Sequence, residues 1–342
     1  MAVEQNIYRL LKTLMVSALS LVLVSCGGGS DDPQDPADVS NSEFCGVNEL
    51  YDAVDEFCYA DCTDLTDEQC DVLEQQLYGD LDNFLDGEFE GPSAGGTAGA
   101  NEPVTIAQYL IRDDLSLELI DNQQPEQAQQ FEDIWKSASR LLPRAIINAD
   151  VSQYHVSTDG VGETLAFVRQ DDNDIEKWIM AFDHQDYTDG MQSEFVHTTI
   201  HELGHIVFLE NSEVDLQSTG ACNTYSIAEG CPNPESVLNR FYQQFWTDII
   251  EENKAAEAMS EAGDEGAALE AFYEQYKNRF VSAYAGTNPV EDLAEVFTYF
   301  VLSDRPAADS VANEKIGFLY GFPALIEIRR GIRSQIGGMG GS

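Results

Sequence analysis

Five residues, His-Glu-Leu-Gly-His at positions 201–205, constrain this chain more than any other feature of its sequence. Residues four apart on an α-helix project from the same face, so His201 and His205 can bind one metal ion together. Glu202 would then lie on the open side of the metal, where a carboxylate can act as a general base. The alternative interpretation is that two core histidines flank an unrelated glutamate on a buried helix.

The flanking sequence favours metal binding. Segment 193–210 contains no proline, and Ser193 at its start is suited to an N-cap. Apolar residues follow at helical spacing, namely Val196, Ile200, Leu203 and Val207. Gly204 lies in mid-helix, where glycine costs roughly 0.5–1 kcal/mol relative to alanine. A glycine there predicts that another backbone, or the wall of a metal site, comes close to the helix.

A second histidine pair on the same helix competes with the first. His197 lies one turn before His201, but Thr198 follows it where the motif requires glutamate. We therefore interpret His197 as a buried histidine with a hydrogen-bond partner beneath the metal site.

A catalytic zinc site normally has three protein ligands and a water molecule, so a third ligand is required. The metzincin pattern would need glycine at position 208 and histidine at 211, and these are Phe208 and Asn211. A thermolysin-like ligand would fall near Tyr225, and Asp215 offers a carboxylate within a polar run. Both are weaker candidates than a segment much further along the chain.

Residues 284–297 form that stronger candidate. Asn288 can cap a helix and Pro289 fits its first position. Glu291 and Glu295 would then lie one turn apart on a single face. Such a pair suits one metal-binding glutamate and a second that orients a ligand histidine through its far ring nitrogen. The alternative is that both are solvated helix charges.

The stretch Tyr284…Thr287-Asn288…Glu291…Ala294-Glu295…Phe297 resembles the second signature of the anthrax lethal factor catalytic domain and related zincin-like peptidases. The resemblance implies one catalytic Zn²⁺, with Glu291 as the third ligand beside His201 and His205. It implies that Tyr284 donates to the tetrahedral intermediate and that Glu295 is the orienting carboxylate. The expected function is zinc-dependent cleavage of a peptide or protein substrate. The expected fold is α+β and zincin-like, a small mixed sheet with a mostly helical C-terminal part.

The first 25 residues have the pattern of a targeting segment. Arg9 and Lys12 precede the apolar run 14–24, which is too short to span a bilayer. The run ends at Cys26, followed by glycines, which resembles a bacterial lipoprotein signal. Cys26 would then carry acyl chains such as palmitate and anchor the protein to a membrane. Gly27 resembles the residue found in lipoproteins sent to the outer membrane. An ordinary secretory signal with an incidental cysteine is the alternative.

The remaining six cysteines are an even number, which fits three disulfides in an oxidising compartment. Cys222 and Cys231 flank a short loop just after the motif helix, and we expect them to pair. Three pairings remain open for the other four cysteines, Cys45, Cys58, Cys62 and Cys70. A structural zinc held by these four is the alternative.

The formal net charge of −45 effectively excludes nucleic-acid binding, because phosphate contacts need clustered lysine and arginine. Such a field would favour cationic substrates. Adaptation to a saline habitat explains the charge better.

Arg329, Arg330 and Arg333 form a basic cluster that we expect to pack against the acidic body of the protein. The run 171–174 is rich in aspartate but lacks the spacing of a calcium loop, so we expect a turn.

Composition divides the chain into five parts. They are a signal peptide (1–25), a flexible tether (26–42), a small cysteine-containing helical segment (43–90), a linker (91–101) and a single catalytic domain (102–342). Helices are expected at 48–57, 67–85 and 125–142, and strands at 151–157, 164–169 and 178–183. The strand 178–183 is expected at the sheet edge, where an extended peptide could add.

A rival function is a non-catalytic lipoprotein that keeps zinc as part of a binding module. Glu202 argues against it, because a binding module has no need of a base beside the metal. A zinc scavenger would want more than the five histidines present.

Overall fold

The computed structural model describes residues 45–52, 57–85, 103–160, 164–190, 192–218, 221–260, 263 and 266–340. The expected signal peptide, Cys26, the tether and the linker 91–101 lie outside these residues. None of the helices in the described ranges is both long and apolar enough to cross a membrane.

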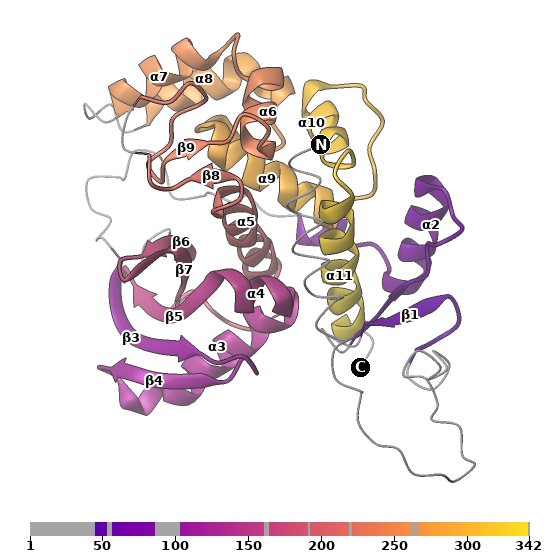
Figure 1. Ribbon diagram of the computed structural model, residues 1–342, viewed down its shortest axis with the longest axis vertical. Helices are drawn as coiled ribbons and strands as arrows, with labels where there is room; N and C mark the ends of the chain where they lie inside the picture. The colour runs from indigo at the N-terminus through magenta and orange to yellow at the C-terminus, as the bar shows by residue number, and fades with distance from the viewer. Residues whose placement is uncertain are drawn as a thin grey trace, which may run out of the picture.

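A five-stranded mixed sheet and a large set of helices make up an α+β fold (Figure 1). The strand order is β4-β3-β5-β7-β6, and only β5 and β7 pair in parallel. The strands are β3 (Val104–Ile111), β4 (Leu117–Asn122), β5 (Val151–Thr158), β6 (Ala166–Asp171) and β7 (Asp174–Asp183). The three expected strands are therefore present, whereas β3 and β4 were not predicted. The aspartate-rich run forms the turn between β6 and β7, as expected.

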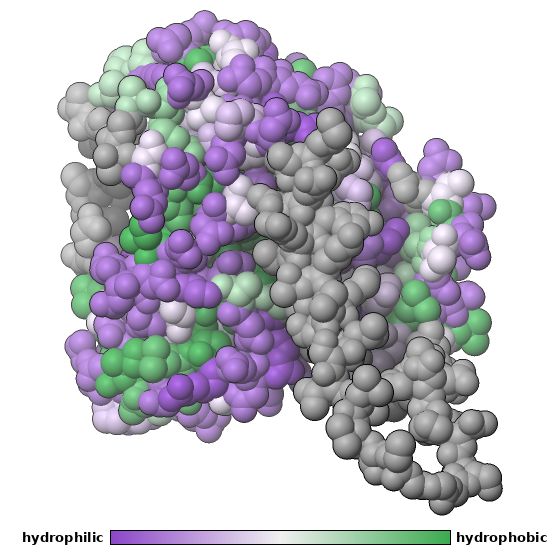
Figure 2. Space-filling model, viewed as in Figure 1, coloured by the Kyte–Doolittle hydropathy of each residue, from purple (hydrophilic) through white to green (hydrophobic). Residues whose placement is uncertain are grey.

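The expectation that 178–183 forms an edge strand is wrong. These residues lie in β7, which has β5 on one side and β6 on the other. From Trp178 to Phe182 each side chain is at most 2% exposed, as a strand covered on both faces requires. The edge strands are β6 and β4. Strand β4 exposes Leu119 and Ile120, and hydrophobic surface is visible at the lower left of Figure 2, in the region where Figure 1 draws β4.

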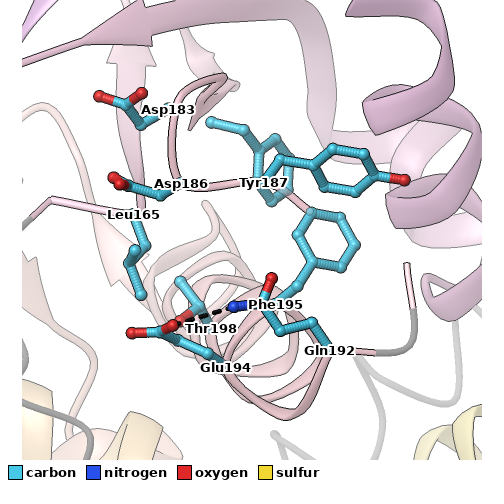
Figure 3. A pocket seen from close by; sticks show the side chains of 9 residues that line it. Leu165, Asp183, Asp186, Tyr187, Gln192, Glu194, Phe195 and Thr198 are labelled. Carbon is cyan, nitrogen blue, oxygen red and sulfur yellow. Dashed lines mark hydrogen bonds between the residues drawn. The ribbon is translucent and has the colours of Figure 1, made fainter. Parts of the chain in front are cut away.

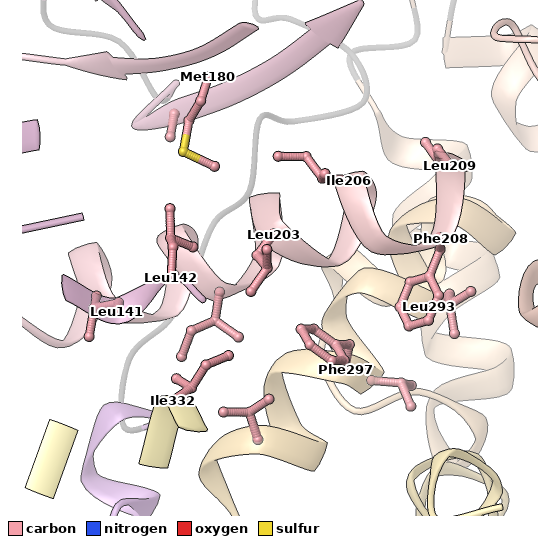
Figure 4. Close-up of a cluster of buried hydrophobic side chains, with 14 of the residues drawn as sticks. Leu141, Leu142, Met180, Leu203, Ile206, Phe208, Leu209, Leu293, Phe297 and Ile332 are labelled. Carbon is pink, nitrogen blue, oxygen red and sulfur yellow. The ribbon is translucent and has the colours of Figure 1, made fainter. Parts of the chain in front are cut away.

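Helix α5 (Ser193–Leu209) carries the five-residue motif and packs between the sheet and helix α9 (Pro289–Leu302) (Figure 4). Leu203 and Ile206 of α5 belong to a core that also includes Met180 of β7 and Phe297 of α9. Ser193 is not the N-cap, since the helix begins at this residue and its hydroxyl donates to the Asn83 carbonyl oxygen instead.

Helices α3 and α4 pack near the sheet, and the rest of the chain is mostly helical, as expected (Figure 1). The expected helix 125–142 is a 3₁₀ turn, η4, followed by α3. The remaining bounds are η4 (Pro125–Gln127), α3 (Ala128–Leu141), α4 (Arg144–Asp150), β8 (Val214–Asp215), β9 (Cys231–Pro232), α6 (Val237–Phe245), α7 (Ile250–Met259), α8 (Ala267–Tyr276), η6 (Lys277–Arg279), η7 (Tyr284–Gly286), α10 (Val311–Leu319) and α11 (Pro323–Gly340).

Gly204 lies where α5 and α9 approach most tightly. A β-carbon at this position would be 3.2 Å from the Ala294 α-carbon and 3.3 Å from the Phe297 ring. Both distances are shorter than ordinary van der Waals contact. The glycine therefore allows the helix with the histidines to lie close to the helix with Glu291.

The cysteine-containing segment differs from its prediction at one end. A helix was expected at 48–57, but the described residues there form a hairpin, β1 (Glu49–Asp52) and β2 (Phe57–Ala60). Disulfides Cys45–Cys58 and Cys62–Cys70 decide between the open pairings, and Cys222–Cys231 forms as expected. The cross-link from Cys45 to β2 favours an extended pair over a helix. Helix α2 (Asp67–Tyr78) and η3 (Asp82–Phe84) occupy most of the expected helix 67–85.

The segment docks on α11 through a buried ion cluster. Glu74 of α2 is fully buried, accepts a hydrogen bond from Arg329, and forms an ion pair with Arg333, whose Nε lies 3.0 Å from Glu74 Oε2. The two arginines also donate to carbonyl oxygens in the last turn of α9, including those of Phe300 at 2.8 Å and Val301 at 3.0 Å. The prediction that this basic cluster packs against the body of the protein is confirmed.

Candidate metal centre

Helices α5 and α9 supply the side chains of the centre. Asn288 caps α9, because its side-chain oxygen accepts from the backbone N–H groups of Val290 and Glu291. Pro289 fills the first helical position, as expected. This cap sets where α9 begins and therefore aims Glu291, in its first turn, at the histidines of α5.

Three donor atoms from these helices converge on one point. His201 Nε2 lies 3.0 Å from His205 Nε2 and 3.1 Å from Glu291 Oε2, and His205 Nε2 lies 3.2 Å from the same oxygen. The three residues form one of the groups that could hold a metal ion. His201 is 5% exposed, and the side chains of His205 and Glu291 are 11% and 19% exposed. The three expected ligands are therefore brought together at the surface end of a buried cluster.

The chemistry of this triangle fits a zinc ion. Ligand atoms of a tetrahedral zinc site with bonds of about 2.0–2.1 Å lie about 3.3 Å apart, close to the observed spacings. His201 Nδ1 lies 2.8 Å from Glu295 Oε1, and a carboxylate only accepts, so this nitrogen carries the proton. When His201 is neutral, the lone pair of Nε2 therefore points toward two other electron-rich atoms. A cation at their centre removes the repulsion between them.

Without a metal, protons compensate this cluster. Burial disfavours the charged form of His201, but hydrogen bonds to Glu291 and Glu295 outweigh it and raise its pKa well above the ordinary value. Burial acts to raise the pKa of Glu291 as well. The two histidines outweigh burial, with His205 contributing most, and hold the pKa of Glu291 well below its ordinary value. The centre is therefore built to contain positive charge.

Glu295 orients the histidines from below. Its Oε1 accepts from His201 Nδ1 and from His197 Nε2, the latter at 2.9 Å, and its Oε2 accepts from the Ser282 hydroxyl at 2.6 Å. His197 is 2% exposed and lies beneath the centre, in the position expected of a buried, hydrogen-bonded histidine. His197, His201 and Glu295 are also close enough to hold a cation, but these hydrogen bonds explain their proximity.

Glu202 faces the edge strand β6. It is 7% exposed and lies near Val168 of that strand. Burial raises the pKa of Glu202, while His205 and His201 act in the opposite direction. A carboxylate with a raised pKa beside a metal-binding triangle is suited to accept and return a proton.

Tyr284 lies over the same centre, at the start of η7. Its ring centroid is 5.5 Å from that of His201, and Glu291 is among the carboxylates that act on its hydroxyl. Burial, reinforced by Glu291 and Glu202, raises the pKa of Tyr284 well above its ordinary value. The phenol therefore stays protonated and can donate a hydrogen bond at the centre.

The weaker ligand candidates lie elsewhere. Asp215 is exposed on β8, where it pairs with Cys231, and Tyr225 stacks on Tyr242. Neither belongs to a potential metal-binding group among the described residues. Sequence reasoning missed Ser282 and Val168, since neither lies in a motif. It also missed an aspartate cluster at the end of the sheet, which is described below.

Comparisons with protein-family models, with curated proteins and with solved structures find no match to this chain.

Proposed function

We propose that the protein is a zinc-dependent metallopeptidase with a zincin-like fold, in which His201, His205 and Glu291 hold one Zn²⁺. The observation that carries the proposal is the triangle of three ligand atoms, 3.0–3.2 Å apart, with Glu202 on the same helix. A site that only stored metal would have no use for a buried carboxylate next to its first ligand. The proposed relationship to the anthrax lethal factor catalytic domain rests on residues 284–297 and on the order of sheet and motif helix.

Each protein group around the centre has its own role in hydrolysis. When bound, Zn²⁺ supplies a Lewis acid for the scissile carbonyl and lowers the pKa of a water molecule. Glu202 accepts a proton from the attacking water and passes it to the leaving amine. The Tyr284 hydroxyl donates to the carbonyl oxygen as negative charge develops there. Glu295 keeps His201 in the tautomer that leaves Nε2 available.

The substrate is an extended peptide that adds to the edge of β6. This strand is at the sheet edge and packs against α5, the helix that carries Glu202. Backbone pairing with an edge strand binds extended peptides with little dependence on their side chains. The scissile peptide bond of the substrate would then lie beside Glu202, the proposed general base.

The proposed location is the bacterial cell envelope, with Cys26 lipidated and the protein held at the outer membrane. The sequence of the first 26 residues supports this anchor. The three disulfides support an oxidising compartment. Nucleic acid is not a partner of so acidic a chain.

Three matched carboxylate substitutions test the function. Glu202→Gln should keep one Zn²⁺ per chain but lose peptide hydrolysis by about 10²–10⁴-fold, the usual contribution of a positioned base. Glu291→Ala should lose both zinc and activity, whereas Asp215→Asn, which changes an exposed carboxylate on β8, should lose neither. Zinc is measured by metal analysis and hydrolysis with a library of quenched fluorescent peptides. Stoichiometric zinc in Glu291→Ala would refute the ligand set. Wild-type protein that holds zinc but cleaves no peptide would show a binding module instead.

A further inference from the structure

A second group of carboxylates lies where strands β5 and β7 end, outside the motifs found in the sequence. Asp159 directly follows β5 and Asp183 ends β7, and these are the two strands that pair in parallel. The carboxyl ends of parallel strands meet at the same sheet edge, so residues 24 positions apart become neighbours. Asp186 joins them from the turn after β7. One carboxylate oxygen from each residue lies within 4.8 Å of the other two.

Two of the three carboxylates, those of Asp159 and Asp183, accept hydrogen bonds from backbone N–H groups. Asp183 Oδ2 accepts from the Asp159 N–H at 2.9 Å, and its Oδ1 accepts from the Gln185 N–H at 2.7 Å. Asp159 Oδ2 accepts from the Thr164 N–H at 3.1 Å. Asp159 is 4% exposed and Asp183 2% exposed. The positions of the oxygens are therefore set by the fold and not by flexible side chains.

Two oxygens of the cluster have no partner within the described part of the chain. Asp159 Oδ1 and Asp186 Oδ2 are both shielded from solvent and accept no hydrogen bond there. A buried carboxylate oxygen without a partner costs free energy, about 1–3 kcal/mol and more when charged. Asp159 is more than nine-tenths buried, so solvent does not satisfy it. These oxygens indicate that a ligand completes the cluster.

The acidic surroundings of the aspartate cluster favour a cation as this ligand. The charged neighbours of Asp186 are Asp183, Asp159 and Glu194, and all three are acids. Figure 3 shows Asp183 and Asp186 together on one side of a pocket, with Glu194 of α5 on another.

We propose that Asp159, Asp183 and Asp186 bind one Ca²⁺. All three ligands are carboxylate oxygens, which a hard cation prefers, and zinc sites in proteins are built mainly from nitrogen and sulfur. Ca²⁺ tolerates an irregular ligand set, whereas Mg²⁺ demands a near-ideal octahedron. The ion would join the loop after β5 to the turn after β7, beside the first turn of α5. The site is separate from the metal centre, so the inference does not depend on the proposed function.

The test measures Ca²⁺ binding to zinc-loaded protein that has been dialysed free of Ca²⁺. Titration calorimetry in excess Mg²⁺ and 0.15 M salt screens the acidic surface from unspecific binding. Wild type should bind one Ca²⁺ per chain. Its Tm should rise by at least about 3 °C at a Ca²⁺ concentration a hundredfold above Kd. Asp186→Asn should bind at least about tenfold more weakly, because it loses one charged ligand. Asp121→Asn, an exposed carboxylate on β4, should behave as wild type.

A measurement on wild type alone covers the case in which a variant fails to fold. Tb³⁺ occupies oxygen-ligand calcium sites, and Tyr187 lines the same pocket as Asp186. Tb³⁺ emission excited through tyrosine should therefore saturate at one ion per chain and disappear when Ca²⁺ is added. The proposal is overturned if Tb³⁺ emission does not respond to Ca²⁺. It is also overturned if Ca²⁺ shifts the Tm of Asp186→Asn as much as that of wild type, which would indicate only screening of the acidic surface.

Discussion

At the residue scale, Glu295 links the metal centre to the fold. One oxygen accepts from two histidines and the other from Ser282, so both oxygens of this buried carboxylate are engaged. Its negative charge stabilises the protonated Nδ1 of His201 and makes the opposite nitrogen a better ligand. Partners of this kind commonly affect metal affinity or activity by about 10–100-fold. The centre is thus a network of three carboxylates and three histidines.

Tyr284→Phe tests the role of the phenol with the least change in shape. The ring stays against His201, and only the hydroxyl is lost. A donor that stabilises developing charge contributes about 2.7–4 kcal/mol in the transition state but little to the bound ground state. We expect kcat to fall about 10²–10³-fold, with KM and zinc content nearly unchanged. Steady-state kinetics and metal analysis provide these values.

Tyr225→Phe is the matched control, because Tyr225 stacks on Tyr242 away from the centre. This variant should keep wild-type kcat. Equal kcat in Tyr284→Phe and wild type would assign Tyr284 a structural role only.

The candidate metal ligands could be identified from sequence because the patterns that mark them are local. His201, Glu202 and His205 share a single helix, and the cap at Asn288 identifies the start of the helix that bears Glu291. The aspartate cluster could not be predicted in this way. Asp159 and Asp183 meet only because β5 and β7 pair in parallel, which is a property of the whole sheet.

At the element scale, the crossing of α5 and α9 controls the distance between the histidines and Glu291. Gly204→Ala would gain up to about 1 kcal/mol of helix propensity. Its new methyl group would nevertheless press on Ala294 at 3.2 Å and move α9 outward. We expect zinc affinity to fall about tenfold, since changes in residues that orient metal ligands, without binding the metal themselves, have effects of this size. Competition with a fluorescent zinc chelator measures the affinity.

Gly317→Ala supplies the control for that substitution. Gly317 lies within α10, and a β-carbon there would meet nothing within 4 Å. The variant should gain the same helix propensity and keep wild-type zinc affinity. If both variants lost zinc affinity, or if neither did, the close approach of α5 and α9 at Gly204 would not be what controls zinc binding.

The start of α6 carries a pH-dependent contribution to stability. Glu213 is 2% exposed, and its Oε2 accepts from the Val237 N–H at 2.6 Å. Burial, with a contribution from Glu210, raises its pKa from 4.5 to about 7. The native state therefore binds more protons than the unfolded state between these values, so the free energy of unfolding falls as pH rises from about 4.5 to 7.

Glu213→Gln should remove this fall, since glutamine keeps an acceptor for Val237 and does not ionise. Relative to the variant, wild type should lose on the order of 2–3 kcal/mol between pH 5 and pH 8. Urea unfolding at the two pH values gives the difference. Glu235→Gln, an exposed change nearby, should follow wild type. Parallel pH profiles for wild type and Glu213→Gln would contradict the assignment.

Element types were easier to predict than their arrangement. The run from Trp178 to Phe182 identified a strand, but its uninterrupted apolar character also indicates an interior position. The expected edge location was wrong because β6 folds back outside β7. Residues 48–57 were expected to form a helix on the basis of their local sequence pattern alone. The disulfide from Cys45 to Cys58 is a tertiary constraint that overrides that pattern.

At the scale of the whole molecule, the cluster of Glu74 with the C-terminal arginines joins the two ends of the described chain. Glu74→Gln would leave Arg329 and Arg333 buried with less compensating charge. Breaking a buried ion pair from one side typically costs about 3–5 kcal/mol. Urea unfolding should show this loss, and limited proteolysis should cut the segment around α2 faster. Glu68→Gln, an exposed change on the same helix, should have little effect on either measurement.

The association of these two ends could be predicted only in part. The arginine cluster near residue 330 suggested contact with acidic groups, but nothing in the local sequence identifies Glu74 as the partner among 62 acidic residues. The pairing depends on how α2, α9 and α11 stack, and that stacking is set by the complete core.

The position of the arginines also sets an order of events during biosynthesis. Arg329 and Glu74 are 255 residues apart, and the carbonyl groups at the end of α9 receive their donors from α11. Contacts of such long sequence separation form late, because the chain between them must first be ordered. A ribosome must therefore have made nearly the whole chain before the last turn of α9 receives these donors. A nascent chain that ends before α11 would carry the histidines of α5 and Glu291 of α9 without the arginines that bind the other end of α9.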